Sequence, residues 1–299
     1  MIEVSVVIPT LNEEKTIGKV IDECSKILSN LKIDHQKIEY NIVVVDGYSK
    51  DNTVGIARKK HAHVIMEERK GKGIAITTAF KKINSDYLIM LDGDGTYNPE
   101  DIPIFLENLM KEDIDIVIGK RIPKDNSMTK LNRLGNYIIN LLIRKLYKLD
   151  VHDICTGFWG FKKKVYKDFT KIEATGFDLE VLMAINSIKY NFILLEIPTE
   201  YKGRIGDTNL SPFRDGALIL GVIIRLLRDY NPIFLFGSLG IFFLVLGLYF
   251  GVRLIITFNE KGFLMIGHTL LTVLFILIAI QTIYFGLLSD LIIRKIDGR

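Results

Sequence analysis

The densest group of chemistry-bearing residues in this chain is Asp92-Gly93-Asp94-Gly95-Thr96, directly after the apolar run 86–91. Two carboxylates two residues apart in a glycine-rich turn can both face one cleft, and such hard oxygen ligands suit Mg²⁺ or Mn²⁺. A divalent ion there would neutralise a leaving diphosphate. Acidic residues in such a turn are also ordinary turn formers. The position after an apolar strand favours the metal interpretation.

A second candidate is Gly71-Lys72-Gly73, which opens a predicted helix. The N–H groups of a helix start can hold an anion, with Lys72 beside it. The spacing matches neither the dinucleotide fingerprint nor the Walker loop, so it predicts neither chemistry. Taken alone, the motif could equally be a plain loop.

Three arginines and one aspartate complete the candidates. Arg121, Arg133 and Arg204 could each hold a phosphate through paired donors, or form surface salt bridges. Asp178 follows Gly176-Phe177 at a predicted helix start. It could act as a base, orient an acceptor, or be an ordinary first-turn residue.

Alternating strand and helix patterns must position these residues. We predict strands at 3–9, 40–46, 63–67, 86–91 and 114–119, separated by helices at 13–30, 53–60, 72–83 and 99–111. Further along we predict a helix at 130–149, a strand or loop at 154–162, a helix at 178–189 and a strand at 192–201. This βαβ alternation predicts an α/β, doubly wound, mostly parallel sheet that binds ligands at the carboxyl ends of its strands.

The end of the chain predicts a membrane anchor. Residues 232–252 and 262–289 carry no charge, and each run is long enough to span a bilayer. With a short connector at 253–261 they predict a helical hairpin, although a buried soluble helix pair is an alternative. Lys and Arg are denser on the flanks of the hairpin than in the connector, which favours a multi-pass protein with two spans and a cytoplasmic N-terminal part.

The residues before the hairpin predict a different kind of helix. Placed on a helix, 213–230 gather their charges on one side, as in a helix lying in the membrane interface. Packing on the globular part is the alternative. We therefore expect a domain at 1–210, an interfacial amphipathic helix at 211–230 and a transmembrane hairpin with a short tail at 231–299.

Composition excludes several classes of protein. With 48% hydrophobic residues the 299-residue chain is neither disordered nor fibrous. A net charge of +4, without a basic stripe, gives no indication of nucleic-acid binding. Two cysteines, Cys24 and Cys155, are too few for a disulfide framework and favour a reducing compartment.

Together the motifs resemble family 2 glycosyltransferases of the GT-A fold, specifically the dolichyl-phosphate mannosyl- and glucosyltransferases. The resemblance covers about residues 3–210 and follows the family's order. It is carried by these stretches: Val6-Val7-Ile8-Pro9-Thr10-Leu11-Asn12-Glu13-Glu14, Val44-Val45-Asp46-Gly47-Tyr48-Ser49-Lys50-Asp51-Asn52-Thr53, Gly71-Lys72-Gly73, Asp92-Gly93-Asp94-Gly95-Thr96, Gly119-Lys120-Arg121, Asp153-Ile154-Cys155-Thr156-Gly157-Phe158, Gly176-Phe177-Asp178-Leu179-Glu180 and Arg204-Ile205-Gly206.

The resemblance implies roles for individual residues. Contacts with the nucleoside would come from Pro9, Leu11, Glu13, Val44 and Asp46. The ribose and diphosphate would lie near Asp92, Gly93 and Asp94, with Lys72 also on the donor. The metal would lie by Asp92, Asp94 and Thr96. Phosphate of donor or lipid would meet Arg121, Arg133 and Arg204.

This chain departs from the family pattern in four places. Gly47 replaces a usual second Asp, Leu11 a common aromatic, Asn209 a usual Lys and Thr96 a frequent Gln. The loss of the second Asp leaves the base contact to Asp46, and the loss of the Lys weakens one phosphate contact.

The implied activity is inverting transfer of a hexosyl group from GDP-mannose, UDP-glucose or UDP-N-acetylglucosamine to dolichyl or polyprenyl phosphate, feeding glycan or glycoprotein synthesis. The sugar, the base, the lipid length, the choice between Mg²⁺ and Mn²⁺ and the oligomeric state stay open. Alternatives are another membrane acceptor (a lipid, a protein or a polysaccharide) and a non-catalytic, membrane-tethered protein that binds nucleotide sugars.

Overall fold

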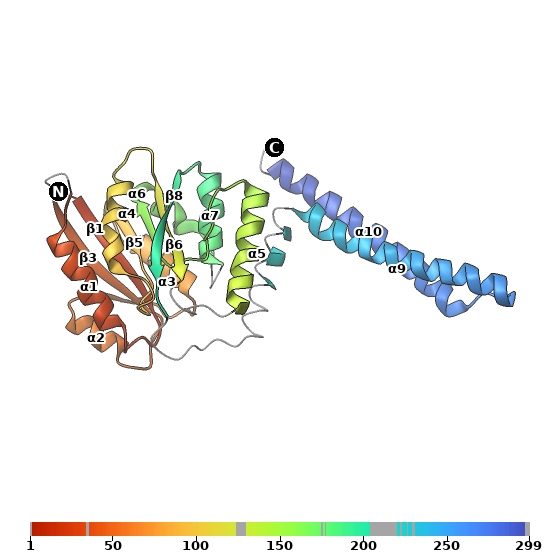
Figure 1. Cartoon of the computed structure of the whole chain (residues 1–299), viewed down its shortest axis with the longest axis horizontal. Coiled ribbons are helices and arrows are strands. Elements are labelled where there is room, and N and C mark those ends of the chain that lie inside the picture. The colour runs from red at the N-terminus through yellow and green to blue at the C-terminus, as the bar shows by residue number, and fades with distance from the viewer. Residues whose placement is uncertain are drawn as a thin grey trace. The chain divides into compact units, whose positions relative to one another are not determined.

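The computed structural model describes residues 2–33, 36–123, 130–174, 176, 178–203, 220, 221, 223–225, 227, 228 and 231–296. The chain divides into two compact units, Met1–Gly216 and Ala217–Arg299 (Figure 1).

The first unit contains one eight-stranded sheet. Its strands are β1 (Ile2–Thr10), β2 (Lys32–Ile33), β3 (Gln36–Asp46), β4 (His63–Met66), β5 (Tyr87–Met90), β6 (Ile116–Pro123), β7 (Trp159–Lys162) and β8 (Leu194–Tyr201). Its helices are α1 (Ile17–Asn30), α2 (Thr53–Lys59), α3 (Lys72–Lys82), α4 (Ile102–Leu109), α5 (Lys130–Tyr147), α6 (Lys163–Asp168) and α7 (Leu179–Lys189), with 3₁₀ turns η1 (Pro99–Asp101) and η2 (Phe169–Lys171).

The strands follow the order β2-β3-β1-β5-β7-β6-β8, and β4 pairs with β3. Pairs β1–β3, β1–β5, β3–β4 and β6–β8 are parallel, as βαβ alternation predicts. Strand β7 runs antiparallel to both β5 and β6, so the sheet is mixed at this point. The sequence did not predict this reversal, because local periodicity carries no information about strand direction.

Helices cover both faces of the sheet. Val4, Val6 and Ile8 of β1 share one core cluster with the buried face of α1 and with α4. Helix α3 contributes nothing to that cluster, yet it packs on β1 and β3. Strand β1 is thus buried on both faces, which explains its nearly continuous apolar sequence.

The parallel strands bring their carboxyl ends to one edge of the sheet. Thr10 at the end of β1 is the register partner of Asp46 at the end of β3. Val7 pairs with Met90 of β5, and Leu91 donates its N–H to Val7 O over 3.0 Å, so Asp92 follows at the same edge.

The second unit contains two long apolar helices, α9 (Pro232–Lys261) and α10 (Ile266–Ile296). Among the described residues, these are the two helices long and apolar enough to cross a membrane. They pack closely at small residues: a Cβ at Gly240 would lie 2.5 Å from Ile283 Cγ1, and one at Gly247 would lie 2.8 Å from Ile276 Cγ1.

The turn of the hairpin is shorter than predicted. We expected a connector at 253–261, but α9 continues through these residues to Lys261. It ends at Gly262, whose φ of +70° is a left-handed conformation that glycine adopts without strain. Most of the predicted interfacial helix, and the boundary near residue 210, lie outside the described residues, so those two predictions stand untested.

Candidate active site

A buried carboxylate organises the loops at the ends of β1 and β3. Thr10 Oγ1 donates to Asp46 Oδ2 over 3.0 Å. Ser49 donates its N–H to Asp46 Oδ1 over 2.8 Å and its hydroxyl to Oδ2 over 2.6 Å. Asp46 has no exposed surface. Its carboxylate therefore fixes the loop after β3, and its contact with a nucleoside base remains a prediction.

The other residues predicted to hold the nucleoside lie in different surroundings. Leu11 is exposed, and Pro9 and Glu13 are half-buried, so all three border the loop after β1. Val44 has no exposed surface and packs in the core. Val44 is thus a core residue of β3, two positions before the carboxyl end of the strand at Asp46.

The Asp92–Thr96 loop is fixed against β1 and α1. A Cβ at Gly93 would lie 3.0 Å from Thr10 Cγ2, a tight contact that requires the side chains of β1 to shift by a few tenths of an ångström. Thr16 Oγ1 donates to Gly93 O over 2.7 Å. Asp94 Oδ1 accepts the N–H of Thr96 over 3.1 Å and its hydroxyl over 2.7 Å. Thr96 thereby orients the Asp94 carboxylate.

Lys72 binds two carboxylates from distant parts of the chain. Its Nζ lies 2.7 Å from Asp92 Oδ1 and 2.8 Å from Glu180 Oε1. Burial alone would lower the pKa of Lys72, but the two carboxylates together raise it above its ordinary value. Burial raises the pKa of Asp92, Lys72 lowers it, and the neighbouring Asp94 raises it again, so that the net shift is upward. The helix start at Lys72 therefore joins the Asp92–Thr96 loop to α7.

Gly157 packs against the Asp92 carboxylate, and Tyr97 binds the backbone of Gly157. A Cβ at Gly157 would overlap the Asp92 carboxylate. Tyr97 Oη accepts the N–H of Gly157 over 2.6 Å and the hydroxyl of Thr156 over 3.2 Å. Tyr97 also stacks edge-on against Tyr201, with 5.2 Å between ring centroids. Burial raises the pKa of Tyr201, and the nearby Asp94 raises it further.

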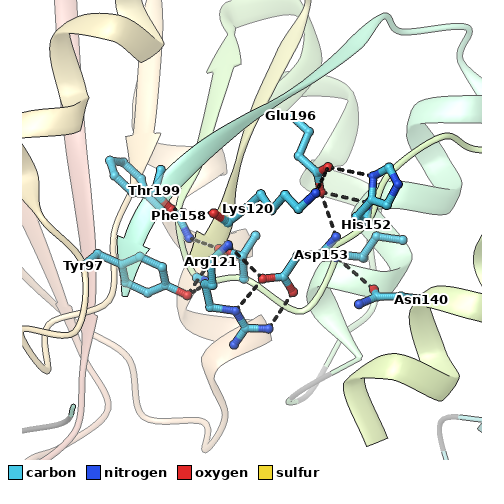
Figure 2. A network of polar contacts seen from close by, with 12 residues as sticks. Tyr97, Lys120, Arg121, Asn140, His152, Asp153, Phe158, Glu196 and Thr199 are labelled. Atoms are coloured by element: carbon cyan, nitrogen blue, oxygen red, sulfur yellow. Dashed lines mark hydrogen bonds and ion pairs between the residues drawn. The ribbon is translucent and has the colours of Figure 1, made fainter. Parts of the chain in front are cut away.

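Arg121 is held by a two-point ion pair (Figure 2). Its Nε and Nη2 donate to Asp153 Oδ2 and Oδ1 over 2.7 and 2.6 Å. The guanidinium lies 5.4 Å from the centroid of the Tyr201 ring. Burial would lower the pKa of Arg121, but its bonds to Asp153 raise it above the ordinary value. Arg121 is thus a fixed cation beside Tyr201, whose ring packs against that of Tyr97.

The remaining predicted residues are less clearly grouped. Asp178 is buried directly before α7, and its Oδ1 accepts the N–H of Gly176 over 2.8 Å. It lies two residues before Glu180, so it stands at the start of α7 near the carboxylate that pairs with Lys72. Arg133 is exposed on the first turns of α5. Arg204 lies outside the described residues.

The side chains fit a metal ion only in part. Within the described ranges, no group of three or more His, Cys, Asp and Glu side chains is arranged to hold one. Asp92 is paired with Lys72, and Asp94 is the other carboxylate of the loop. Mg²⁺ commonly takes one or two carboxylates and completes its shell with water and substrate phosphates. The loop fits an ion of that kind, whose remaining ligands would come from water and the substrate phosphates.

The sequence assigned no role to three residues that the structure brings into the site: Tyr97, Asp153 and Glu180. Asp153 and Glu180 did leave a signal, since both belong to the motifs quoted above, and Glu180 is the single acid within the largely apolar helix α7. The partners of Tyr97 come from a remote segment, and no local pattern predicts them.

This edge of the sheet defines a class of protein: an α/β domain of the GT-A type, with paired carboxylates, a lysine and an arginine where parallel strands end. The chain belongs to glycosyl transferase family 2, and the match to this family covers residues 5–170. It is a glycosyltransferase.

Two relatives come from Haloferax volcanii. Glycosyltransferase AglJ is 36% identical, with 97% of this chain and 93% of the relative covered. A dolichyl-phosphate hexose transferase is 35% identical, with 75% of this chain and 93% of the relative covered. A solved structure of glucosyl-3-phosphoglycerate synthase from Mycobacterium tuberculosis, with Mn²⁺, UDP and glucosyl-3-phosphoglycerate, has a TM-score of 0.59 at 24% identity. It covers 76% of this chain and 79% of its own. That likeness confirms the fold.

Proposed function

We propose that this protein transfers a hexosyl group, with inversion, from a nucleotide sugar to dolichyl or polyprenyl phosphate at the cytoplasmic face of a membrane. The observation that carries the proposal is the Lys72–Asp92 ion pair, which sets a lysine against the paired-carboxylate loop at the end of β5. The relative named dolichyl-phosphate hexose transferase and the two apolar helices support a lipid acceptor.

The donor would lie along the carboxyl ends of β1, β3 and β5. The nucleoside would lie by Pro9, Leu11, Glu13 and the loop that Asp46 fixes, and the diphosphate by the Asp92–Thr96 loop. Asp92, Asp94 and Thr96 would hold a divalent ion, as the Mn²⁺ in the solved relative suggests. When bound, that ion supplies positive charge to the departing diphosphate.

The acceptor needs positioning more than activation. A lipid monophosphate is already anionic near neutral pH, so its oxygen attacks C1 of the sugar and no proton has to be removed first. The bond from C1 to the diphosphate oxygen breaks, and a nucleoside diphosphate leaves. Arg121, Arg133 and Arg204 reduce repulsion between the two phosphorylated substrates, and Asp178 orients the acceptor.

The direct test is transfer of radiolabelled sugar to an organic-extractable product. Full-length protein in detergent is given GDP-mannose, UDP-glucose or UDP-N-acetylglucosamine with polyprenyl phosphate, and with Mg²⁺, Mn²⁺ or a chelator. We expect label in lipid with one donor and metal present, and its release by mild acid as the free sugar. Label in lipid or protein without added polyprenyl phosphate would favour another acceptor. Donor binding without any transfer would favour a non-catalytic binding protein.

A further inference from the structure

Three consecutive backbone N–H groups in the segment between α5 and β7 are bound by side chains instead of by another strand (Figure 2). His152 and Asp153 both donate to Glu196 Oε1, over 2.8 and 2.7 Å. Ile154 donates to Asn140 Oδ1 over 3.0 Å. A buried N–H group that lacks a partner is costly. These two side chains therefore determine the path of the segment.

Glu196 does most of this. It belongs to β8, where it is the register partner of Ile118 in β6, and its side chain is 12% exposed. Its second oxygen, Oε2, lies 3.0 Å from His152 Nδ1 and 3.9 Å from Lys120 Nζ. One carboxylate thus joins two adjacent strands to the irregular segment.

The consequence reaches Arg121 through Asp153. The Asp153 carboxylate accepts three N–H donors of Arg121: the side-chain Nε and Nη2, and the backbone N–H over 3.1 Å. The two-point geometry requires a defined position of the carboxylate relative to the guanidinium, and a fixed backbone at Asp153 helps to set that position. Glu196 fixes that backbone by binding the N–H of Asp153 itself.

We propose that Glu196 is a positioning residue for Arg121: it fixes segment 152–154, so that Asp153 holds the guanidinium ready for a substrate phosphate. This inference rests on the proposed function, which gives Arg121 a phosphate to bind. This phosphate belongs either to the sugar donor or to the lipid acceptor. Because the two substrates have separate Michaelis constants, kinetics can tell which of them Arg121 binds.

Substitutions of Glu196 separate the effect of its hydrogen-bond-accepting oxygen from the effect of its negative charge. Glu196→Ala removes the acceptor of two N–H groups, that of the exposed His152 and that of the buried Asp153. Glu196→Gln keeps an oxygen for both, and its amide faces His152 Nδ1, which can accept a hydrogen bond as the neutral tautomer. Glu196→Asp keeps the charge but withdraws the oxygens by one methylene. It replaces the alanine variant if that variant does not fold.

The experiment measures kcat and KM for both substrates in the full-length protein. We expect Arg121→Ala to raise one KM more than the other, and Glu196→Ala to raise the same KM roughly tenfold, the factor that corresponds to leaving the one buried N–H group, that of Asp153, without its acceptor. Glu196→Gln should stay within about threefold of wild type. Glu196→Ala added to Arg121→Ala should cause little further change, because both disable one cation.

Asp115→Ala is the matched control for Glu196→Ala. Asp115 is also buried and accepts a backbone N–H, that of Ile193 over 3.1 Å, but it lies just before the opposite end of β6. It should lower the melting temperature and leave both KM values unchanged. Equal changes in both KM values with Glu196→Ala, or full additivity in the double variant, would overturn the inference.

The proposed function can fail separately. If wild-type protein transfers no sugar, calorimetric titration with UDP, GDP and a short polyprenyl phosphate replaces the kinetics. Affinity for the phosphate compound that Arg121→Ala weakens should then fall with Glu196→Ala as well. Unchanged affinity would refute the role of Glu196 whatever the reaction.

Discussion

At the scale of single residues, Asp94 offers the clearest separation of chemistry from folding. Asp94→Asn keeps an oxygen for the N–H and hydroxyl of Thr96, so the loop should keep its conformation. The charge that a divalent ion needs is lost. We expect sugar transfer to fall by at least about a hundredfold, as for loss of a group that stabilises developing charge.

Melting temperature checks that the fold is intact. Asp113→Asn, at an exposed position, controls for the loss of one surface charge. Full metal-dependent activity in Asp94→Asn would contradict the metal role of the loop.

The ion pairs of Lys72 predict that substitutions at Lys72 and Glu180 have coupled effects on the free energy of unfolding. Lys72→Met leaves Asp92 and Glu180 facing each other without their cation. Because the side chains of Lys72 and Asp92 are about a quarter exposed, we expect a cost of about 1–3 kcal/mol, below that of breaking a fully buried pair. Adding Glu180→Gln removes one of the two opposed charges. The double variant should therefore be more stable than Lys72→Met alone, as measured by melting temperature. If the two effects simply add, Lys72 and Glu180 are not coupled.

At the scale of elements, the sequence predicted the strands and helices well where periodic burial is strong. Strands β1 and β3 and helix α1 appear where their apolar patterns place them. The two-residue strand β2 and the short helix α6 are too brief to produce a pattern. The direction of β7 is decided by its pairing with β5 and β6, which the segment does not encode locally.

The same reasoning explains what could be predicted of the site. Asp46 and Asp92 lie at the same edge of the sheet because the ends of parallel strands share one edge, and the strand pattern reveals those ends. Asp153 and Glu196 act on residues far away in the chain. Their roles follow from tertiary contacts, so a single sequence cannot reveal them.

The loop that leads into α3 predicts a pH dependence. Glu67 at its start accepts hydrogen bonds from Arg69 Nε over 2.8 Å and from the Thr78 hydroxyl. The bonds to Arg69, opposed by burial and helped by Thr78, lower the pKa of Glu67 from 4.5 to about 2. The folded-state pKa is depressed, so this stabilisation is present above about pH 4.5 and is lost as the pH falls through about 2.

Comparison with Glu67→Gln isolates this contribution. The wild type should melt at a higher temperature than the variant near pH 6. The difference should shrink as the pH falls from about 4.5 towards 2. Glu112→Gln, at an exposed position, controls for the lost charge. A difference that stays constant from pH 6 to pH 3 would contradict the role of the Glu67 carboxylate.

At the scale of the whole molecule, the open question is which side of the membrane the catalytic unit occupies. The proposed donor is a water-soluble nucleotide sugar and the proposed acceptor a lipid, so the proposed reaction would take place at a bilayer face that nucleotide sugars reach. Basic residues on the outer flanks of the hairpin, among them Arg225, Arg294 and Lys295, outnumber those near the turn, Arg253 and Lys261. We therefore predict that the turn between α9 and α10 faces away from the cytoplasm.

The native cysteines make this testable in intact cells. Burial raises the pKa of Cys24 and of Cys155 to about 12, so neither forms the reactive thiolate near neutral pH. Phe263→Cys, exposed in the turn, should react with a membrane-impermeant maleimide in intact cells. Asp113→Cys in the catalytic unit should react only after permeabilisation. The reverse pattern would place the catalytic unit outside, where nucleotide sugars made in the cytoplasm do not reach it, and would rule out the reaction proposed for it.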